Sequence, residues 1–166
     1  STTAALAFGD ALAMTLLVKK GFREEDFAHL HPGGQLGKRL LRVERLMHTD
    51  DQVPRVTTGL SMSDVVTTMS SFGFGMTCVM TDDDQLAGII TDGDLRRHLS
   101  EHTNLFDLKA SDVLSQNPLT INRSALAVQA LNLMEEHRVT SLVVVDDERH
   151  LVGLVHLHDL WRTELF

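Results

Sequence analysis

The sequence predicts an α/β (α+β) protein built from two β-α-β-β-α repeats, which are preceded by a helical segment. Two observations carry this prediction. The stretch GIITDGDLRRHL at residues 88–99 has a looser copy, GLVHLHDLWRTEL, at residues 153–165, so the chain contains a duplication with an offset of 65 residues. Around both copies, apolar residues first alternate and then recur at three- and four-residue spacing, which is typical of strands followed by helices.

The first 22 residues predict a helix, which begins at Ser and Thr and ends at Lys19-Lys20-Gly21. This helix is apolar on nearly every side except at Asp10, and such a helix must be buried in a larger core. We therefore expect residues 1–45 to be the truncated tail of a larger domain and a linker. A signal peptide is the rival interpretation, but the segment lacks a basic start and carries Asp10.

The first repeat is expected over residues 46–104 and the second over residues 105–166. Each begins with a short helical segment and a brief strand, at Val56 or Ile121. A helix follows at residues 61–72 or 125–137, and then two strands that turn at an acidic cluster, as hairpins do. The closing helix begins at Asp92 or Leu157. Because a unit of about 60 residues buries little surface by itself, we expect the two sheets to pack face to face.

Composition excludes several classes of function. A net charge of −8 disfavours nucleic acid as a partner, since phosphates demand a basic face. No uninterrupted apolar run reaches the roughly 18 residues of a membrane span, so we expect no membrane partner. The single cysteine, Cys78, cannot form an internal disulfide, which suits a cytoplasmic protein.

Thr91 and Asp94 allow two interpretations, both of which stay open. In a capping box, Thr91 accepts from the N–H of Asp94, and the Asp94 carboxylate accepts from the N–H of Thr91. In a ligand site, the same groups bind a ribose, and the helix start binds phosphate. The second repeat keeps Asp159 but has His156 in place of the threonine. Because histidine is a poor N-cap, His156 favours the ligand.

Further candidates come from the strand starts and the histidines. Thr57, Met76, Thr140 and Ser141 are expected to face the same cleft as Thr91. We predict no metal site, although two alternatives exist: His29 with His31, and His156 and His158 with Asp159, completed by His48 or His150. The methionines at positions 62, 69, 76 and 80 are expected to pack in the core or an interface.

The order of elements, with Gly-apolar-apolar-Thr-x-x-Asp closing the second hairpin strand, resembles the cystathionine-β-synthase (CBS) domain. Two copies in tandem over residues 46–166 resemble a CBS pair. The resemblance implies that Thr91 and Asp94 bind a nucleotide ribose. His156 departs from that pattern, which puts the usual adenosine-binding mode in doubt for the second repeat.

The segments STTAALAFGDALAM, HPGGQLGKRLL, LMHTDD, GIITDGDLRR and LHLHDL together resemble the D-arabinose-5-phosphate isomerases, in which a sugar isomerase (SIS) domain precedes a CBS pair. This resemblance implies a parent enzyme that interconverts D-arabinose 5-phosphate and D-ribulose 5-phosphate for Kdo, a sugar of lipopolysaccharide or capsule. It also implies that His31, in the HPGG loop, is catalytic in the parent. Most of the SIS domain has no counterpart here, so this chain by itself is expected to be inactive.

We therefore expect a regulatory module that requires no cofactor and binds a small-molecule effector, either a nucleotide or the nucleotide sugar CMP-Kdo. Self-association is also expected, as a dimer of CBS pairs and a tetramer in the parent. The alternative is a purely structural dimerisation module without a ligand.

Overall fold

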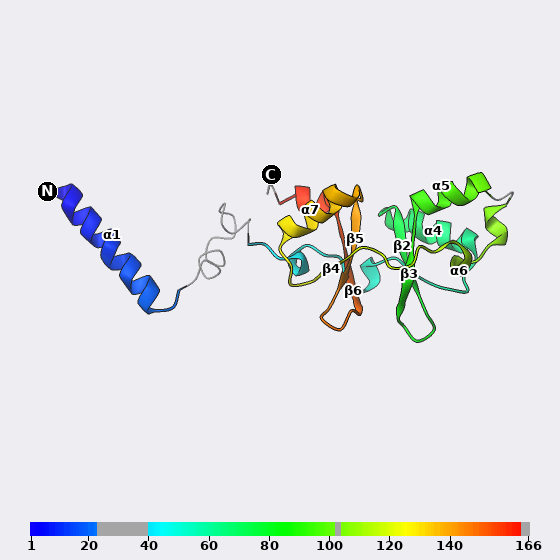
Figure 1. The fold of residues 1–166 in the computed structure, drawn as a ribbon, viewed down its shortest axis with the longest axis horizontal. Coiled ribbons are helices and arrows are strands. Elements are labelled where there is room, and N and C mark those ends of the chain that lie inside the picture. The colour runs from blue at the N-terminus through cyan, green and yellow to red at the C-terminus, as the bar shows by residue number, and fades with distance from the viewer. Residues whose placement is uncertain (23–39, 102–103, 164–166) are drawn as a thin grey trace.

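The computed structural model describes residues 1–22, 40–101 and 104–163, and Figure 1 shows how they are arranged. Helix α1 spans Thr2–Lys19, as predicted. It ends in a turn at Gly21, whose φ is 67° and beyond which the Phe22 N–H donates to the Leu17 carbonyl at 3.0 Å. The predicted break at Pro32 and the catalytic candidate His31 lie outside the described residues.

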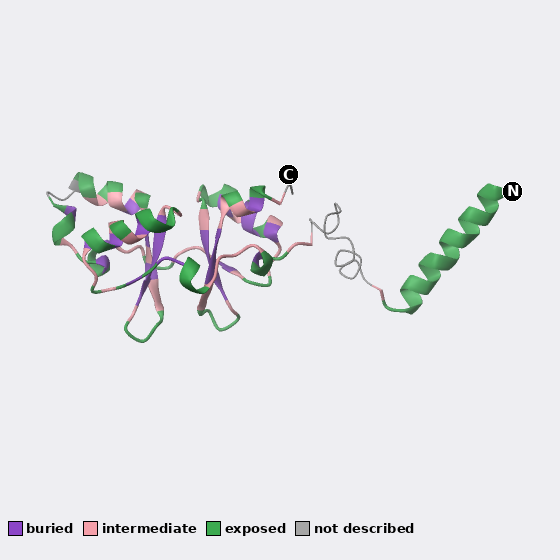
Figure 2. Cartoon of the chain, turned by 180° about the vertical axis from the view of Figure 1, so that it is seen from behind, coloured by how far each residue is buried: buried purple, intermediate pink, exposed green. Residues whose placement is uncertain are grey.

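No residue of α1 is buried, and Figure 2 draws the whole helix as exposed. Leu6, Phe8 and Val18 are 66, 73 and 77% exposed. The larger core that the sequence predicts around this helix is therefore not supplied by the described residues. By length and composition alone, α1 is also long and apolar enough to cross a membrane. The core helix of a soluble protein has the same composition.

Each repeat forms a three-stranded sheet with helices on one side, in the predicted order. The first contains β1 (Arg55–Thr57), α4 (Met62–Phe72), β2 (Met76–Met80), β3 (Leu86–Thr91) and α5 (Asp92–Glu101). The second contains β4 (Thr120–Asn122), α7 (Ala127–His137), β5 (Ser141–Val145), β6 (Leu151–His156) and α8 (Leu157–Trp161). In both sheets the middle strand pairs parallel with the first strand and antiparallel with the third. Even the register shift recurs, at Val79/Met80 and at Val144/Val145.

The two sheets pack face to face, as predicted, because side chains alternate along the middle strands. On β2, Met76, Cys78 and Met80 enter a cluster shared with Val143 and Val145 of β5, whereas Val79 faces the helices of its own repeat. The four methionines named from the sequence are all buried, in this cluster or in the first repeat's own core. Burial raises the pKa of the Cys78 thiol to about 12, although Arg55 opposes the shift, so this thiol is unreactive at neutral pH.

The segment that precedes each repeat packs on the other repeat. Val43, in the short helix η1 (Val43–Arg45), is fully buried in the core of the second repeat, and His48 pairs with Leu154 of β6. Correspondingly, the segment with η3 (Leu105–Asp107) and α6 (Ala110–Val113) fills the core of the first repeat, and Ser115 pairs with Ile89 of β3. The remaining short helix, η2 (Asp50–Gln52), leads into β1. Residues 41–48 therefore connect whatever precedes them to the second repeat first.

Candidate functional site

A cleft of about 410 Å³ lies where the two repeats meet. The first repeat contributes the start of β2 and the junction of β3 with α5. The second contributes the end of α7 and the start of β5. Of the residues predicted from the sequence, Met76, Thr91, Thr140 and Ser141 line this cleft. The structure thus brings together four predicted residues from two repeats.

Four other predicted residues are not among those that line this cleft. Thr57 pairs with Met80, at the end of β2 opposite to Met76, because β1 runs parallel to β2. Asp94 is 2% exposed and faces inward from α5. His156 and Asp159 occupy the equivalent junction of the second repeat, between β6 and α8.

Thr91 and Asp94 form the predicted capping box. The Thr91 N–H and hydroxyl both donate to Asp94 Oδ2, at 2.9 and 2.7 Å, and the Asp94 N–H donates back to Thr91 Oγ1 at 3.3 Å. Oδ1 of Asp94 accepts from the Ser115 hydroxyl at 2.8 Å and from Arg97 at 2.9 Å. Burial alone would raise the pKa of Asp94, but the hydrogen bonds from Thr91, Ser115 and Arg97 outweigh it and lower that pKa. The carboxylate is fully engaged, so ribose binding by Asp94 stays a prediction.

His156 caps helix α8, which corrects the expectation that histidine would not serve there. Its Nδ1 accepts from the His158 N–H at 3.2 Å, and Asp159 Oδ2 accepts from the His156 N–H at 3.1 Å. The cap therefore requires a neutral ring with an unprotonated Nδ1. Asp159 Oδ2 also lies 2.9 Å from Nε2 of His48, which takes the place that Ser115 has beside Asp94.

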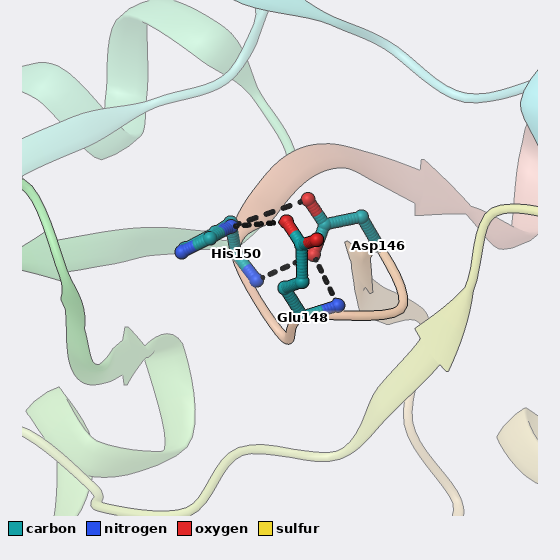
Figure 3. A group of neighbouring side chains, drawn as sticks. All are labelled: Asp146, Glu148 and His150. Atoms are coloured by element: carbon teal, nitrogen blue, oxygen red, sulfur yellow. Dashed lines mark hydrogen bonds and ion pairs between the residues drawn. The ribbon is translucent and has the colours of Figure 1, made fainter.

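Of the two histidines named to complete the metal alternative, His150 precedes β6 and His156 ends it, so these two cannot share an ion. His48 does lie beside the other candidates, with Nε2 2.9 Å from Asp159 Oδ2, so that form of the alternative stays a prediction. His150 instead joins Asp146 and Glu148 in the hairpin turn, where the three candidate ligand atoms lie within 4.8 Å of one another (Figure 3). Asp146 accepts there from the backbone N–H groups of Glu148 and His150, at 3.0 and 2.8 Å. These bonds close the turn, and this group was not predicted from the sequence.

Lowering the pH below about 6.5, the usual pKa of histidine, is expected to destabilise the second repeat through His156. Burial and the nearby His158 and His48 lower the pKa of His156, while Asp159 opposes them, so the folded chain takes up this proton less readily than the unfolded chain. The contribution of neutral His156 to the free energy of unfolding is therefore fully present above pH 6.5, and it is lost as the pH falls towards the lowered pKa of His156.

Thermal unfolding between pH 8 and pH 5.5 measures this loss. The matched variant is His156→Thr, which places the cap of the first repeat in the second and cannot titrate. We expect His156→Thr to flatten the pH dependence, whereas the control His137→Gln, at an exposed residue of α7, should leave the dependence intact. Equal slopes for wild type and His156→Thr would contradict the prediction.

Sequence reasoning missed the charged residues of the cleft, which are Asp92, Arg96 and Arg138. The sequence did contain a signal for them, because each of these charged residues aligns with an uncharged residue of the other repeat at the offset of 65. Comparing the repeats for identities alone overlooks such positions.

The family model of the CBS domain matches residues 43–101 and 110–160. The chain belongs to the CBS-domain family. Its sequence is also 44% identical over 163 residues to arabinose 5-phosphate isomerase KdsD of Escherichia coli strain K12, covering 98% of this chain and 49% of that protein. KdsD of Pseudomonas aeruginosa is likewise 44% identical, with 98% and 50% covered. The chain therefore spans about half the length of these relatives, and the resemblance drawn from the sequence is confirmed.

Solved CBS-pair structures share the fold. An uncharacterized conserved protein from Pyrococcus horikoshii matches with a TM-score of 0.67 at 22% identity, covering 76% of this chain and 93% of that one. CBSX2, an Arabidopsis thaliana CBS-pair protein solved with AMP, matches with a TM-score of 0.64 at 22% identity, covering 75% and 96%. The CBS pair of protein MJ0100, solved with 5'-methylthioadenosine and S-adenosyl-L-methionine, matches with a TM-score of 0.65 at 18% identity, covering 74% and 94%.

Proposed function

We propose that this chain is the regulatory CBS pair of an arabinose 5-phosphate isomerase, and that it binds a nucleotide or a nucleotide sugar such as CMP-Kdo. The observation that carries the proposal is the cleft between the repeats, where the polar residues Thr91, Thr140 and Ser141 lie beside an apolar wall that includes Met76 and Ile89. Small-molecule sites combine apolar walls with a few polar groups in this way. The similarity to KdsD supports the same ligand class, as do the AMP in the CBSX2 structure and the adenosine derivatives in the MJ0100 structure.

The proposed parent reaction moves a proton between adjacent carbons of a sugar phosphate, which requires a base near both carbons. His31 is our proposed catalytic residue in that parent. We propose that this chain alone does not catalyse the reaction, because the other acid–base groups that the resemblance implies have no counterpart in its sequence. A cytoplasmic location and self-association belong to the same proposal.

An effector changes the parent's activity only if it binds one arrangement of the protein better than another. The connection to the preceding residues runs through residues 41–48, which pack on the second repeat. A ligand that contacts both repeats would fix the first repeat relative to that connection. This gives the cleft a physical route to whatever domain precedes residue 41.

The test is thermal unfolding of this chain with AMP, ATP, CMP, CMP-Kdo and arabinose 5-phosphate. A ligand at 100 times its Kd adds about 2.7 kcal/mol, which for a chain of this size raises Tm by roughly 5–10 °C. We expect Thr140→Ala, in the cleft, to reduce that shift and Thr67→Ala, on the exposed face of α4, to leave it unchanged. If none of the compounds shifts the Tm, ligand binding is refuted and the structural dimerisation module is favoured. That alternative predicts a dimer in analytical ultracentrifugation.

A further inference from the structure

The duplication allows the cleft to be compared, position by position, with the equivalent surface of the other repeat. Thr91 and His156 each end the last strand of a hairpin, and each begins the following helix. Helices α4 and α7 likewise end at equivalent residues, Gly73 and Arg138, and both adopt the left-handed conformation, with φ of 72° and 55°. The two surfaces are therefore built on the same backbone, and their differences lie in the side chains.

The charged residues of the cleft all have uncharged equivalents. Arg138 corresponds to Gly73, Arg96 to Trp161, and Asp92 to Leu157. Both arginines are exposed, and within the described part of the chain neither guanidinium has a hydrogen-bond or ion-pair partner. Two such cations in one cleft are notable in a chain with a net charge of −8.

Arg138 also occupies a position that suits glycine better. Glycine adopts a positive φ at little cost, whereas a residue with a Cβ does not, and the first repeat has Gly73 at the equivalent place. The second repeat instead carries a long cation that lines the cleft. A residue held in an unfavourable backbone conformation beside a cavity points to a role in that cavity.

The equivalent surface carries the aromatic rings of His156, His158 and Trp161, which adjoin Phe74 at the edge of the cleft itself. Ring centroids lie 5.9 Å apart for Phe74 and His156, 5.0 Å for His156 and His158, and 5.4 Å for His158 and Trp161. Burial lowers the pKa of His156, with His158 and His48 acting in the same direction and Asp159 against it. At neutral pH His156 therefore supplies no positive charge.

We propose that the cleft binds one phosphate-bearing ligand per chain, with Arg96 of the first repeat and Arg138 of the second contacting its phosphate, and that the equivalent aromatic surface does not take this ligand. The inference rests on the proposed function and adds to it the charge of the ligand, the stoichiometry and the residues that select it. Because each repeat supplies one guanidinium, the phosphate also joins the repeats across the cleft.

Calorimetric titration of this chain with AMP, adenosine, CMP and cytidine tests the inference. For the monophosphate that binds, we expect one site per chain. Arg138→Gly should lower the affinity for that monophosphate by about 10- to 100-fold, as loss of a charged hydrogen bond does. It should change the affinity for the corresponding nucleoside by less than about twofold. Arg96→Trp, which places the residue of the second repeat in the first, should also lower the affinity for the monophosphate more than the affinity for the nucleoside.

Arg149→Gly is the matched control. Arg149 is also exposed and left-handed, with a φ of 68°, but it lies in the turn between β5 and β6, and not among the residues that line the cleft. The Arg149→Gly variant should bind the monophosphate with the affinity of the wild type. Both glycine variants should unfold at or above the wild-type Tm, because both relieve a positive φ.

Three results would overturn the inference. If Arg138→Gly binds the monophosphate as tightly as Arg149→Gly, or if the wild type takes up two equivalents, the charge selection is wrong while nucleotide binding stands. If Arg138→Gly lowers the affinities for the nucleoside and for the monophosphate equally, the arginine does not contact the phosphate. If the wild type binds none of the four compounds, the inference fails together with nucleotide binding.

Discussion

Replacing Gly88 by alanine is expected to destabilise the CBS pair by about 3 kcal/mol, the upper end of the usual cost of overpacking. A Cβ at Gly88 would lie 2.5 Å from the Ser115 carbonyl oxygen and 2.7 Å from Leu114 Cδ1. The first of these is backbone and cannot rotate away. That carbonyl accepts from the Ile89 N–H at 3.0 Å, and the Ser115 N–H donates to the Ile89 carbonyl at 2.8 Å. The methyl group would push the segment before the second repeat off β3 and break both bonds.

Denaturant unfolding measures the loss, and Gly59→Ala is its control. A Cβ at Gly59 would meet no atom within 4 Å, and the φ of this residue is not positive, so its substitution should change stability by less than about 0.5 kcal/mol. Gly153→Ala should behave like Gly88→Ala, because its Cβ would lie 2.6 Å from the His48 carbonyl oxygen. Equal stability of Gly88→Ala and Gly59→Ala would show that the segment moves aside freely, contrary to the prediction.

The order of the elements could be predicted because it depends on local pattern. Met62, Val65 and Met69 recur at helical spacing and are all buried on one side of α4. The two strands of each hairpin were likewise predicted from short apolar runs that turn at an acidic cluster, and Met76, Cys78 and Met80 of β2 do face the other repeat. In both cases the residues that make the element also carry the signal.

The exchange of segments between the repeats could not be predicted in this way. Val43 is apolar, but no sequence pattern around it indicates that it is buried in the second repeat and not in the first. The repeated glycines, Gly88 and Gly153, were noticed as part of a motif. Their physical reason, the close approach of a segment distant in sequence, appears only in three dimensions.

The candidate site shows the same division. Thr91 and Thr140 were found because strand ends are predictable, and both line the cleft. Thr57 is not among the residues that line this cleft, because β1 runs parallel to β2, and the relative direction of two strands cannot be predicted from either strand alone. His156 was misjudged from general N-cap preferences, because the ring nitrogen that accepts the bond depends on the local turn.

Replacing Asp94 by alanine is expected to cost about 3 kcal/mol, because it removes a buried carboxylate and leaves its donors unpaired. Four contacts of 2.7–2.9 Å would be lost, two from Thr91, one from Ser115 and one from Arg97. The side chain of Asp94 is 3% exposed, so water cannot readily replace them. Unfolding in denaturant at pH 7 gives the value.

Asp159→Ala is the matched variant in the second repeat. Asp159 makes two contacts, to the His156 N–H and to His48, and its side chain is 17% exposed, so we expect roughly half the loss. Arg97→Ala, at a side chain 59% exposed, should cost less than about 1 kcal/mol. Equal losses at Asp94 and Asp159 would show that the extra bonds to Ser115 and Arg97 contribute nothing.

The effect of Asp94 also decides how ligand binding to this chain must be tested. Asp94 holds Ser115, which pairs with β3, and Thr91, which lines the cleft, so its removal disturbs the cleft without any direct contact to a ligand. A lost thermal shift in Asp94→Ala would therefore not assign the ribose to this carboxylate. Asp94→Asn keeps Oδ1 as an acceptor for Ser115 and Arg97 but turns an amide N–H towards the two donors of Thr91, so it removes the hold on Thr91 alone. If Asp94→Asn recovers at least half of the lost stability but none of the lost affinity, the affinity depends on the oxygen of Asp94 that holds Thr91. If stability and affinity recover together, Asp94 supports the cleft through Ser115 and Arg97.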